Sequence, residues 1–125
     1  MATKDIRVLF NKLDEIAYDE LDMEKTLEGR LDPEFNSNWA RVYMRLMYIK
    51  RDVNYPEGRK QISNTYARRS FEKVMKHANC IGLASVVSDD MGLLYDGLTL
   101  KYEDPWFLKM VELYEQGKIP TGRLE

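Results

Sequence analysis

The feature that most constrains the fold is the helical spacing of apolar residues in the middle of the chain. On a wheel of about 100° per residue, the apolar side chains of residues 39–53 fall within about a third of the circle. Those side chains are Trp39, Val42, Tyr43, Leu46, Ile49 and Val53. A second stripe consists of Ala67, Phe71, Val74 and Ala78. The two stripes predict two amphipathic helices, which we expect to pack together as a long antiparallel hairpin.

Turn residues and possible caps set the expected limits of these two helices. The first helix is predicted to begin near Ser37 or Asn38, because either side chain can cap its N-terminus, and Asp32-Pro33 is predicted to form a turn before it. The second is predicted to cover residues 61–78, with a polar cap at Ser63 or its neighbour. Proline and glycine at turn spacing separate the two.

The remaining helices are predicted from the same kind of pattern. Residues 4–18 repeat apolar side chains at helical spacing. Residues 79–87 could be a strand or a short buried helix, and we expect the helix because no second stretch alternates cleanly to pair with a strand. Ser88-Asp89-Asp90 and Glu103-Asp104-Pro105 have the composition of helix N-termini, so the last two helices are predicted to begin there.

Together these segments predict an all-α fold. We expect a single compact domain of five or six helices over residues 1–125, with a central basic helical hairpin and with residues 1–3 and 121–125 frayed. A chain of 125 residues buries roughly two-thirds of its unfolded surface, which is enough for a core without disulfides or metals.

Charge is distributed unevenly along a chain whose net charge is only −2. Residues 39–76 contain ten Lys or Arg and three Asp or Glu, a net charge of +7. Residues 1–38 contain five basic and ten acidic residues, and residues 77–125 contain four and eight, so their net charges are −5 and −4. The outer sides of the two central helices are therefore predicted to form a basic face between two acidic ends.

The residues that most kinds of catalysis need are missing or isolated. His77 is the single histidine and Cys80 the single cysteine, so a catalytic triad would have to be built around His77 and a structural zinc site would lack ligands. The sequence has no glycine-rich phosphate loop, and its acidic stretch at residues 19–28 lacks the spacing of a calcium loop. We therefore expect no enzyme, no cofactor and no metal.

The predicted function is binding, and the basic face is the predicted site. Its candidate residues are Arg41, Arg45, Tyr48, Arg68, Arg69, Lys73 and Lys76. Arg and Tyr are residue types that anchor protein interfaces, and a basic face attracts an acidic partner electrostatically. We expect a small non-enzymatic protein of the regulatory, inhibitory or immunity type that binds another, acidic protein.

Other interpretations use the same residues. A nucleic-acid-binding regulator would place phosphates on the basic face and stack bases on Tyr48 and Tyr66, although the net acidic charge makes nucleic acid the less favoured partner. In another interpretation, residues 5–34 cover the basic side chains and form a solvated ion-pair network with them. Apolar residues outside the main stripes could mark a partner surface or a homodimer interface. These residues are Met44, Tyr48, Leu93, Leu100 and Leu108.

The chain shows no sign of membrane targeting. No apolar run approaches the ~18 residues that a membrane span needs, and the first residues lack the apolar core of a secretory signal. The lone Cys80 cannot form an internal disulfide, which suits a reducing compartment. We expect a cytoplasmic protein without a membrane partner.

Overall fold

The computed structural model describes residues 5–124, and within that range the chain forms six α-helices and no strand. The helices are α1 (Ile6–Lys12), α2 (Met23–Arg30), α3 (Pro33–Asp52), α4 (Glu57–Ala78), α5 (Ile81–Thr99) and α6 (Pro105–Glu115). Two short 3-10 turns, Leu13–Glu15 and Tyr18–Glu20, connect α1 to α2. None of these helices is long and apolar enough to cross a membrane. The predicted all-α fold of five or six helices is confirmed.

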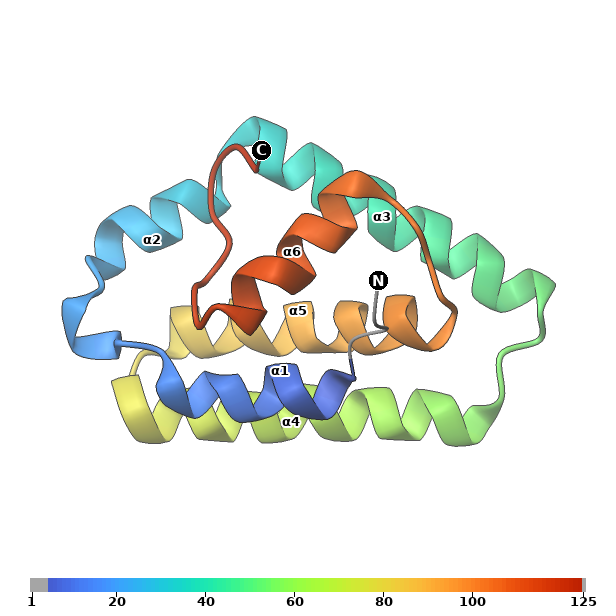
Figure 1. Ribbon diagram of the computed structural model, residues 1–125, viewed down its shortest axis with the longest axis horizontal. Helices are drawn as coiled ribbons and strands as arrows, with labels where there is room; N and C mark the ends of the chain where they lie inside the picture. The colour runs from blue at the N-terminus through green and yellow to red at the C-terminus, as the bar shows by residue number, and fades with distance from the viewer. Residues whose placement is uncertain (1–4, 125) are drawn as a thin grey trace.

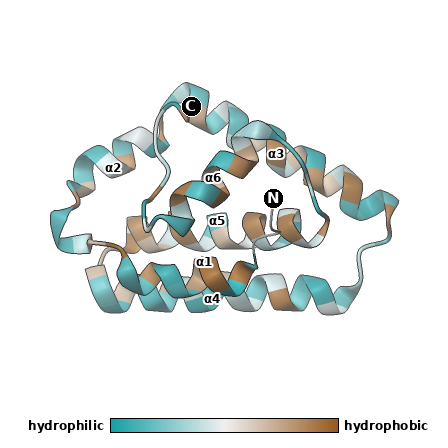
Figure 2. Cartoon of the chain, in the orientation of Figure 1, coloured by the Kyte–Doolittle hydropathy of each residue, from teal (hydrophilic) through white to brown (hydrophobic). Residues whose placement is uncertain are grey.

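α5 is the central helix of the domain. α4 runs antiparallel along it, α1 and α6 pack against it, and α3 crosses over it (Figure 1). α5 carries apolar residues on nearly all sides, whereas much of α3 and α4 is hydrophilic (Figure 2). Its fully buried side chains include Leu83, Val87, Met91 and Leu94. The core therefore forms around α5 rather than around the two basic helices.

The long hairpin of the fold consists of α4 and α5, so the predicted hairpin of α3 and α4 is wrong. In Figure 1 α3 and α4 diverge from the loop that joins them, and α5 lies between them. Both helices bury the middle of their apolar stripes, at Val42 and Leu46 of α3 and at Val74 of α4, but each packs on α5. An amphipathic stripe shows that a helix has a buried face without showing which helix covers it. Because α5 is apolar nearly all round, it covers both.

α5 is unbroken, so the predicted start of a helix at Ser88 is wrong. Asn79 adopts a left-handed backbone conformation, with φ of 49°, and ends α4 just before α5 begins. Within α5, the hydroxyl of Ser88 donates a hydrogen bond of 2.8 Å to the carbonyl of Ala67 on α4. Asp90 is fully buried. These polar residues look like helix caps in the sequence because their partners lie far away along the chain.

α3 and α6 begin with the same local motif, at residues 32–35 and 104–107. In each, the aspartate side chain accepts a hydrogen bond from the backbone N–H of the phenylalanine, at 3.1 Å and 2.9 Å, and the proline is the first helical residue. The predicted start of α6 is confirmed. The predicted start of α3 at Ser37 or Asn38 is wrong, because Asp32-Pro33 caps this helix instead of turning before it. α4 likewise begins before its predicted cap, at Glu57.

The two ends of the described chain fold back on their neighbours. α1 is shorter than the helix predicted over residues 4–18, because the 3-10 turns follow it and Tyr18 donates its hydroxyl hydrogen to the Leu13 carbonyl at 2.7 Å. Near the C-terminus, the Gly122 N–H donates to the Gly29 carbonyl at 3.0 Å. Residues 1–3 and 125, which are predicted to fray, lie outside the described residues. Fraying of residues 121–124 stays a prediction.

Candidate functional site

The structure separates the seven predicted site residues into two groups. The α3 group contains Arg41, Arg45 and Tyr48, and the α4 group contains Arg68, Arg69, Lys73 and Lys76. The groups stand apart because α3 and α4 diverge on either side of α5 (Figure 1). The predicted single basic face is thus divided into two surfaces with different surroundings.

The N-terminal part of the chain covers one portion of the α4 group. Lys73 Nζ lies 2.7 Å from Oδ2 of Asp14 and 4.0 Å from the centre of the Phe10 ring. The guanidinium of Arg69 also lies over this ring, at 5.7 Å. The hydrogen bonds from Lys73 and then His77 lower the pKa of Asp14. An acidic residue near the N-terminus thus neutralises charge at this end of α4.

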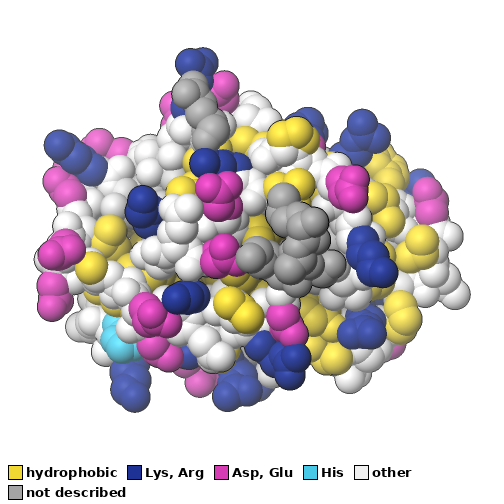
Figure 3. All heavy atoms as spheres, in the orientation of Figure 1, with side chains coloured by type: hydrophobic (Ala, Val, Ile, Leu, Met, Phe, Trp, Pro, Cys, Tyr) yellow, Lys and Arg dark blue, Asp and Glu magenta, His cyan; other side chains and the backbone are white. Residues whose placement is uncertain are grey.

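The rest of the α4 group faces solvent. Arg68 is exposed and lies 3.7 Å from Glu72 of the same helix, a spacing that contributes little in water. Lys76 is exposed as well. Lys and Arg side chains follow the edge of the molecule over α4, with acidic side chains among them (Figure 3). This edge therefore carries mixed charge with accessible cations.

The α3 group surrounds a hollow between α3 and the segment that leads into α6. Arg41 Nη1 lies 2.6 Å from Oδ2 of Asp104. Arg45 is exposed, and within residues 5–124 its side chain makes no hydrogen bond or ion pair. The ring of Tyr48 is 47 % exposed and lies 5.0 Å below the guanidinium of Arg51. Arg45 and Tyr48 are thus the accessible members of this group.

The hollow beside the α3 group has a volume of about 460 Å³ and contains charges of both signs. It is lined by Arg41, Arg45, Tyr48, Ile49, Asp52, Tyr102, Glu103 and Asp104. Partial burial acts to raise the pKa of Asp104, but hydrogen bonds from Arg41 and from the Phe107 backbone N–H outweigh it and lower that pKa. The hollow therefore fits a partner surface with polar groups and charges of both signs better than a partner surface that is only acidic.

Four large side chains on the solvent side of α3 are exposed. Tyr43, Met44, Met47 and Tyr48, which we call the α3 crest, are 47 %, 43 %, 42 % and 47 % exposed. Met44 and Tyr48 lie outside the buried stripe, as the sequence predicts. The prediction that Tyr43 and Val53 face inward is wrong, because α4 leaves α3 instead of packing on it. Of the other off-stripe residues, Leu108 is exposed whereas Leu93 lies in the core.

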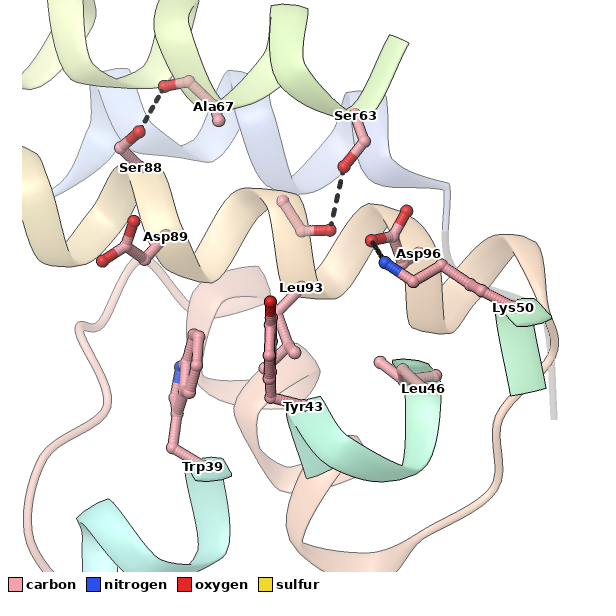
Figure 4. Close-up of a pocket in the computed structure, with 11 residues that line it drawn as sticks. Trp39, Tyr43, Leu46, Lys50, Ser63, Ala67, Ser88, Asp89, Leu93 and Asp96 are labelled. Atoms are coloured by element: carbon pink, nitrogen blue, oxygen red, sulfur yellow. Dashed lines mark hydrogen bonds and ion pairs between the residues drawn. The ribbon is translucent and has the colours of Figure 1, made fainter. Parts of the chain in front are cut away.

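A second hollow, the α3–α5 groove, lies on the other side of the α3 crest (Figure 4). It is lined by Trp39, Tyr43, Leu46, Lys50, Ser63, Ala67, Ser88, Asp89, Gly92, Leu93 and Asp96. The rings of Trp39 and Tyr43 stack with a centroid distance of 5.6 Å. At the opposite end of the groove, Lys50 Nζ binds Oδ2 of Asp96 at 3.0 Å. α3 therefore projects as a ridge with a hollow along each side.

A buried polar network, which the sequence did not predict, holds α3 in this position. Both carboxylate oxygens of Asp90 accept hydrogen bonds from Arg30, each at 2.6 Å. Trp39 Nε1 donates to Asp90 at 2.9 Å, and the Tyr114 hydroxyl donates at 2.5 Å. Arg30 also donates to the Pro120 carbonyl at 3.3 Å. Asp90 thus connects α2, α3, α5, α6 and the C-terminal segment.

The network has a structural role, because its charged groups are buried and therefore not accessible to a substrate. Asp90 is fully buried and the Arg30 side chain is only 7 % exposed. Burial, followed by the charge of Asp90, raises the pKa of Tyr114, which keeps the phenol as a hydrogen-bond donor. The one sequence signal for this network is an aspartate within a helix that is otherwise apolar on most sides.

His77 contacts residues of the two 3-10 turns near the end of α4. The His77 ring stacks on Tyr18 with a centroid distance of 5.3 Å, and its Nε2 lies 2.9 Å from Oδ1 of Asp14. These contacts hold the end of α4 against the 3-10 turns. Among residues 5–124, no three His, Cys, Asp or Glu side chains come together in a way that could hold a metal ion.

Comparison with known proteins places the chain in a family. The model of the family described as immunity protein PIM1 matches residues 7–121, nearly the whole chain. No curated protein and no solved structure shows a significant match. Because the match covers nearly all of the helical domain, the chain belongs to the PIM1 family of immunity proteins.

Proposed function

We propose that this protein protects the cell that makes it by binding a harmful protein and blocking its action, without catalysing a reaction itself. The observation that carries this proposal is the match of residues 7–121 to a family of immunity proteins. The uncovered ridge of α3 supports it, because Tyr and Met side chains and nearby Arg side chains are typical of the central parts of protein interfaces.

The α3 crest is the best candidate for the centre of the interface. Its four side chains lie together on one long helix and cover no part of the core. α3 is held by the Asp32 cap at one end, by Trp39 bonded to Asp90, and by Lys50 bonded to Asp96. A rigid helix loses little conformational entropy when it binds, so more of the contact energy contributes to affinity.

The basic residues have a separate part in this proposal, which is to attract an acidic partner. Arg45 lies next to the crest, and its side chain has no partner among residues 5–124. Arg41 is paired with Asp104, so it mainly positions the rim of the hollow. Arg68, Arg69, Lys73 and Lys76 lie further away, on α4. Charges at the rim of an interface affect the association rate more than the affinity.

Binding can be tested with the protein encoded next to this one in its genome, since an inhibitor and its target need to be produced together. We expect the purified pair to form a stoichiometric complex by isothermal titration calorimetry, and co-expression to restore growth. Tyr48→Asp is expected to weaken binding at least about 30-fold, because loss of a central aromatic anchor costs about 2 kcal/mol or more. Arg45→Glu is expected mainly to slow association.

The matched control is Ile81→Asp. Ile81 is 67 % exposed and lies at the start of α5, away from the α3 crest. Equal loss of affinity in Ile81→Asp and Tyr48→Asp would contradict a binding site on α3. A wild-type protein that neither binds the neighbouring gene product nor restores growth would contradict the proposed function.

Nucleic acid is the alternative partner for the same basic residues. A titration with DNA and RNA at low and moderate salt tests it, because phosphate neutralisation makes affinity fall steeply as salt rises. Each basic surface also contains acidic residues, such as Asp14 beside Lys73 and Asp104 beside Arg41. Their negative charge opposes phosphate binding. We therefore expect no complex even at low salt, and a salt-sensitive complex would favour the alternative.

A further inference from the structure

We infer that the α3–α5 groove receives a cationic side chain, an arginine or lysine, from the bound protein. This inference rests on the proposed function, and it adds the chemistry of one contact to it. The acceptor in the groove is the carboxylate of Asp89, and the wall beside it consists of the stacked rings of Trp39 and Tyr43.

Asp89 differs from the other two aspartates of α5 in having no side-chain partner within residues 5–124. Asp90 is paired with Arg30, and Asp96 is paired with Lys50. The side chain of Asp89 makes no hydrogen bond or ion pair to any residue in the described part of the chain, although it lines the groove. Its carboxylate is exposed and is therefore a free acceptor at the edge of the groove.

The charges around Asp89 favour an incoming cation. Partial burial and then the neighbouring charge of Asp90 raise the pKa of Asp89, and the charge of Arg30 only partly offsets this. The groove's own cation, Lys50, is bound to Asp96 at the other end. A positive charge bound next to Asp89 would stabilise its ionised carboxylate against the negative charge of Asp90, whereas an anion would be repelled.

The aromatic wall adds a second reason for a cation. In Figure 4 Trp39 and Tyr43 rise from α3 toward α5, and Asp89 stands on α5 at the end of the groove where Trp39 lies. The bond from Trp39 Nε1 to Asp90 fixes the indole ring. Arg and Lys bind favourably to aromatic faces, and Trp is the strongest partner. A cation bound to Asp89 would therefore also contact π-electron density.

The size and lining of the groove fit one long side chain. Its volume is about 180 Å³, which is too small for a helix of the partner. Leu46, Ala67 and Leu93 provide apolar surface for an aliphatic stem. Gly92 keeps the floor low, since a Cβ there would stand 3.6 Å from Ser63 Oγ and 4.0 Å from the Ala67 Cβ. Arginine, with its planar guanidinium, suits this combination of carboxylate and ring particularly well.

The first test compares Asp89→Asn with wild type in binding the partner protein. We expect Asp89→Asn to weaken binding about tenfold or more, as for other close interfacial charge pairs. Asp19→Asn, an equal change of charge at an exposed residue of a 3-10 turn, is the matched control and should bind like wild type. Because Asp89 is strained electrostatically in the free protein, the unfolding midpoint of Asp89→Asn should stay the same or rise.

The second test needs no partner. N-acetyl-arginine amide is titrated into the protein at millimolar concentration while the Trp39 indole N–H signal is followed by NMR, and N-acetyl-citrulline amide serves as the neutral isostere. We expect a saturable shift with the arginine compound alone, and none in Asp89→Asn. Equal shifts with both compounds, or none with either, would overturn the inference.

The outcomes separate the inference from the proposed function. If wild type binds the partner and Asp89→Asn binds equally tightly, the groove does not receive a cation and the inference is overturned, while the proposed function stands. If wild type does not bind the partner at all, the proposed function fails and the inference fails with it.

Discussion

Removal of the buried carboxylate by Asp90→Ala is expected to be among the most destabilising single changes in this protein. Arg30 would lose its counter-ion in a site where its side chain is only 7 % exposed. Breaking a buried ion pair by removing one partner costs about 3–5 kcal/mol. The Tyr114 hydroxyl, which is fully buried, would also lose its acceptor, and an unsatisfied group of this kind adds about 1–3 kcal/mol.

These costs are a large share of the stability of an ordinary domain, which is about 5–15 kcal/mol. We therefore expect the free energy of unfolding to fall by at least about 4 kcal/mol. With a denaturant dependence of about 2 kcal/mol per molar urea, the unfolding midpoint should fall by roughly 2 M. Urea titration followed by far-UV circular dichroism measures this midpoint directly.

Two further variants check the reasoning. Asp89→Ala removes the adjacent carboxylate of the same helix, which has no partner in the described part of the chain, and it should leave the midpoint unchanged or raise it. Asp90→Leu combined with Arg30→Met buries no charge, and it should be more stable than Asp90→Ala. A fall of less than about 0.5 M for Asp90→Ala, or a double variant no more stable than the single one, would refute this account of the network.

Two other predictions concern α5 and the N-terminal contacts. In Gly97→Ala the new Cβ would stand 2.1 Å from Cζ of Phe107, so thermal denaturation should show a loss of about 1–3 kcal/mol; Gly92→Ala meets only ordinary contacts and should gain up to about 1 kcal/mol from helix propensity. Equal effects would contradict the packing described. The lowered pKa of Asp14 means that its contribution to stability is present above the ordinary aspartate pKa and is lost as the pH falls through the lowered value. Asp14→Asn should therefore flatten the acid side of a stability–pH curve measured by urea titration, and an unchanged curve would show that Lys73 and His77 do not bind Asp14 in solution.

Local signals in the sequence were sufficient to predict the helical class and several helix ends. The start of α6 follows from Asp104-Pro105, in which a capping side chain precedes the residue best suited to the first helical position. Asp32-Pro33 has the same chemistry but predicts a turn equally well, since the two residues do not themselves show whether a helix follows. The amphipathic stripes of α3 and α4 were real as well, and they predicted buried faces at Val42, Leu46 and Val74.

The wrong predictions concern residues and helices that contact each other in the fold but lie far apart along the chain. Asp90 and Arg30 are 60 residues apart, and no local pattern connects them, so Asp90 looked like a helix cap. The pairing of α4 with α5 depends on a third helix that is apolar nearly all round, which a wheel of α3 or α4 cannot show. The basic face was divided for the same reason. The exposure of Tyr43 follows directly from that division.

One side of α3 packs on the core and the other side is exposed, and this difference determines which substitutions in the helix the domain can tolerate. Trp39 and Leu46 hold the helix to the core, while Tyr43, Met44, Met47 and Tyr48 contribute little to it. Exposed positions of this kind usually tolerate substitution within about 0.5 kcal/mol. New partner specificities can therefore evolve, or be selected from a library, by changing four neighbouring side chains while the domain keeps its fold.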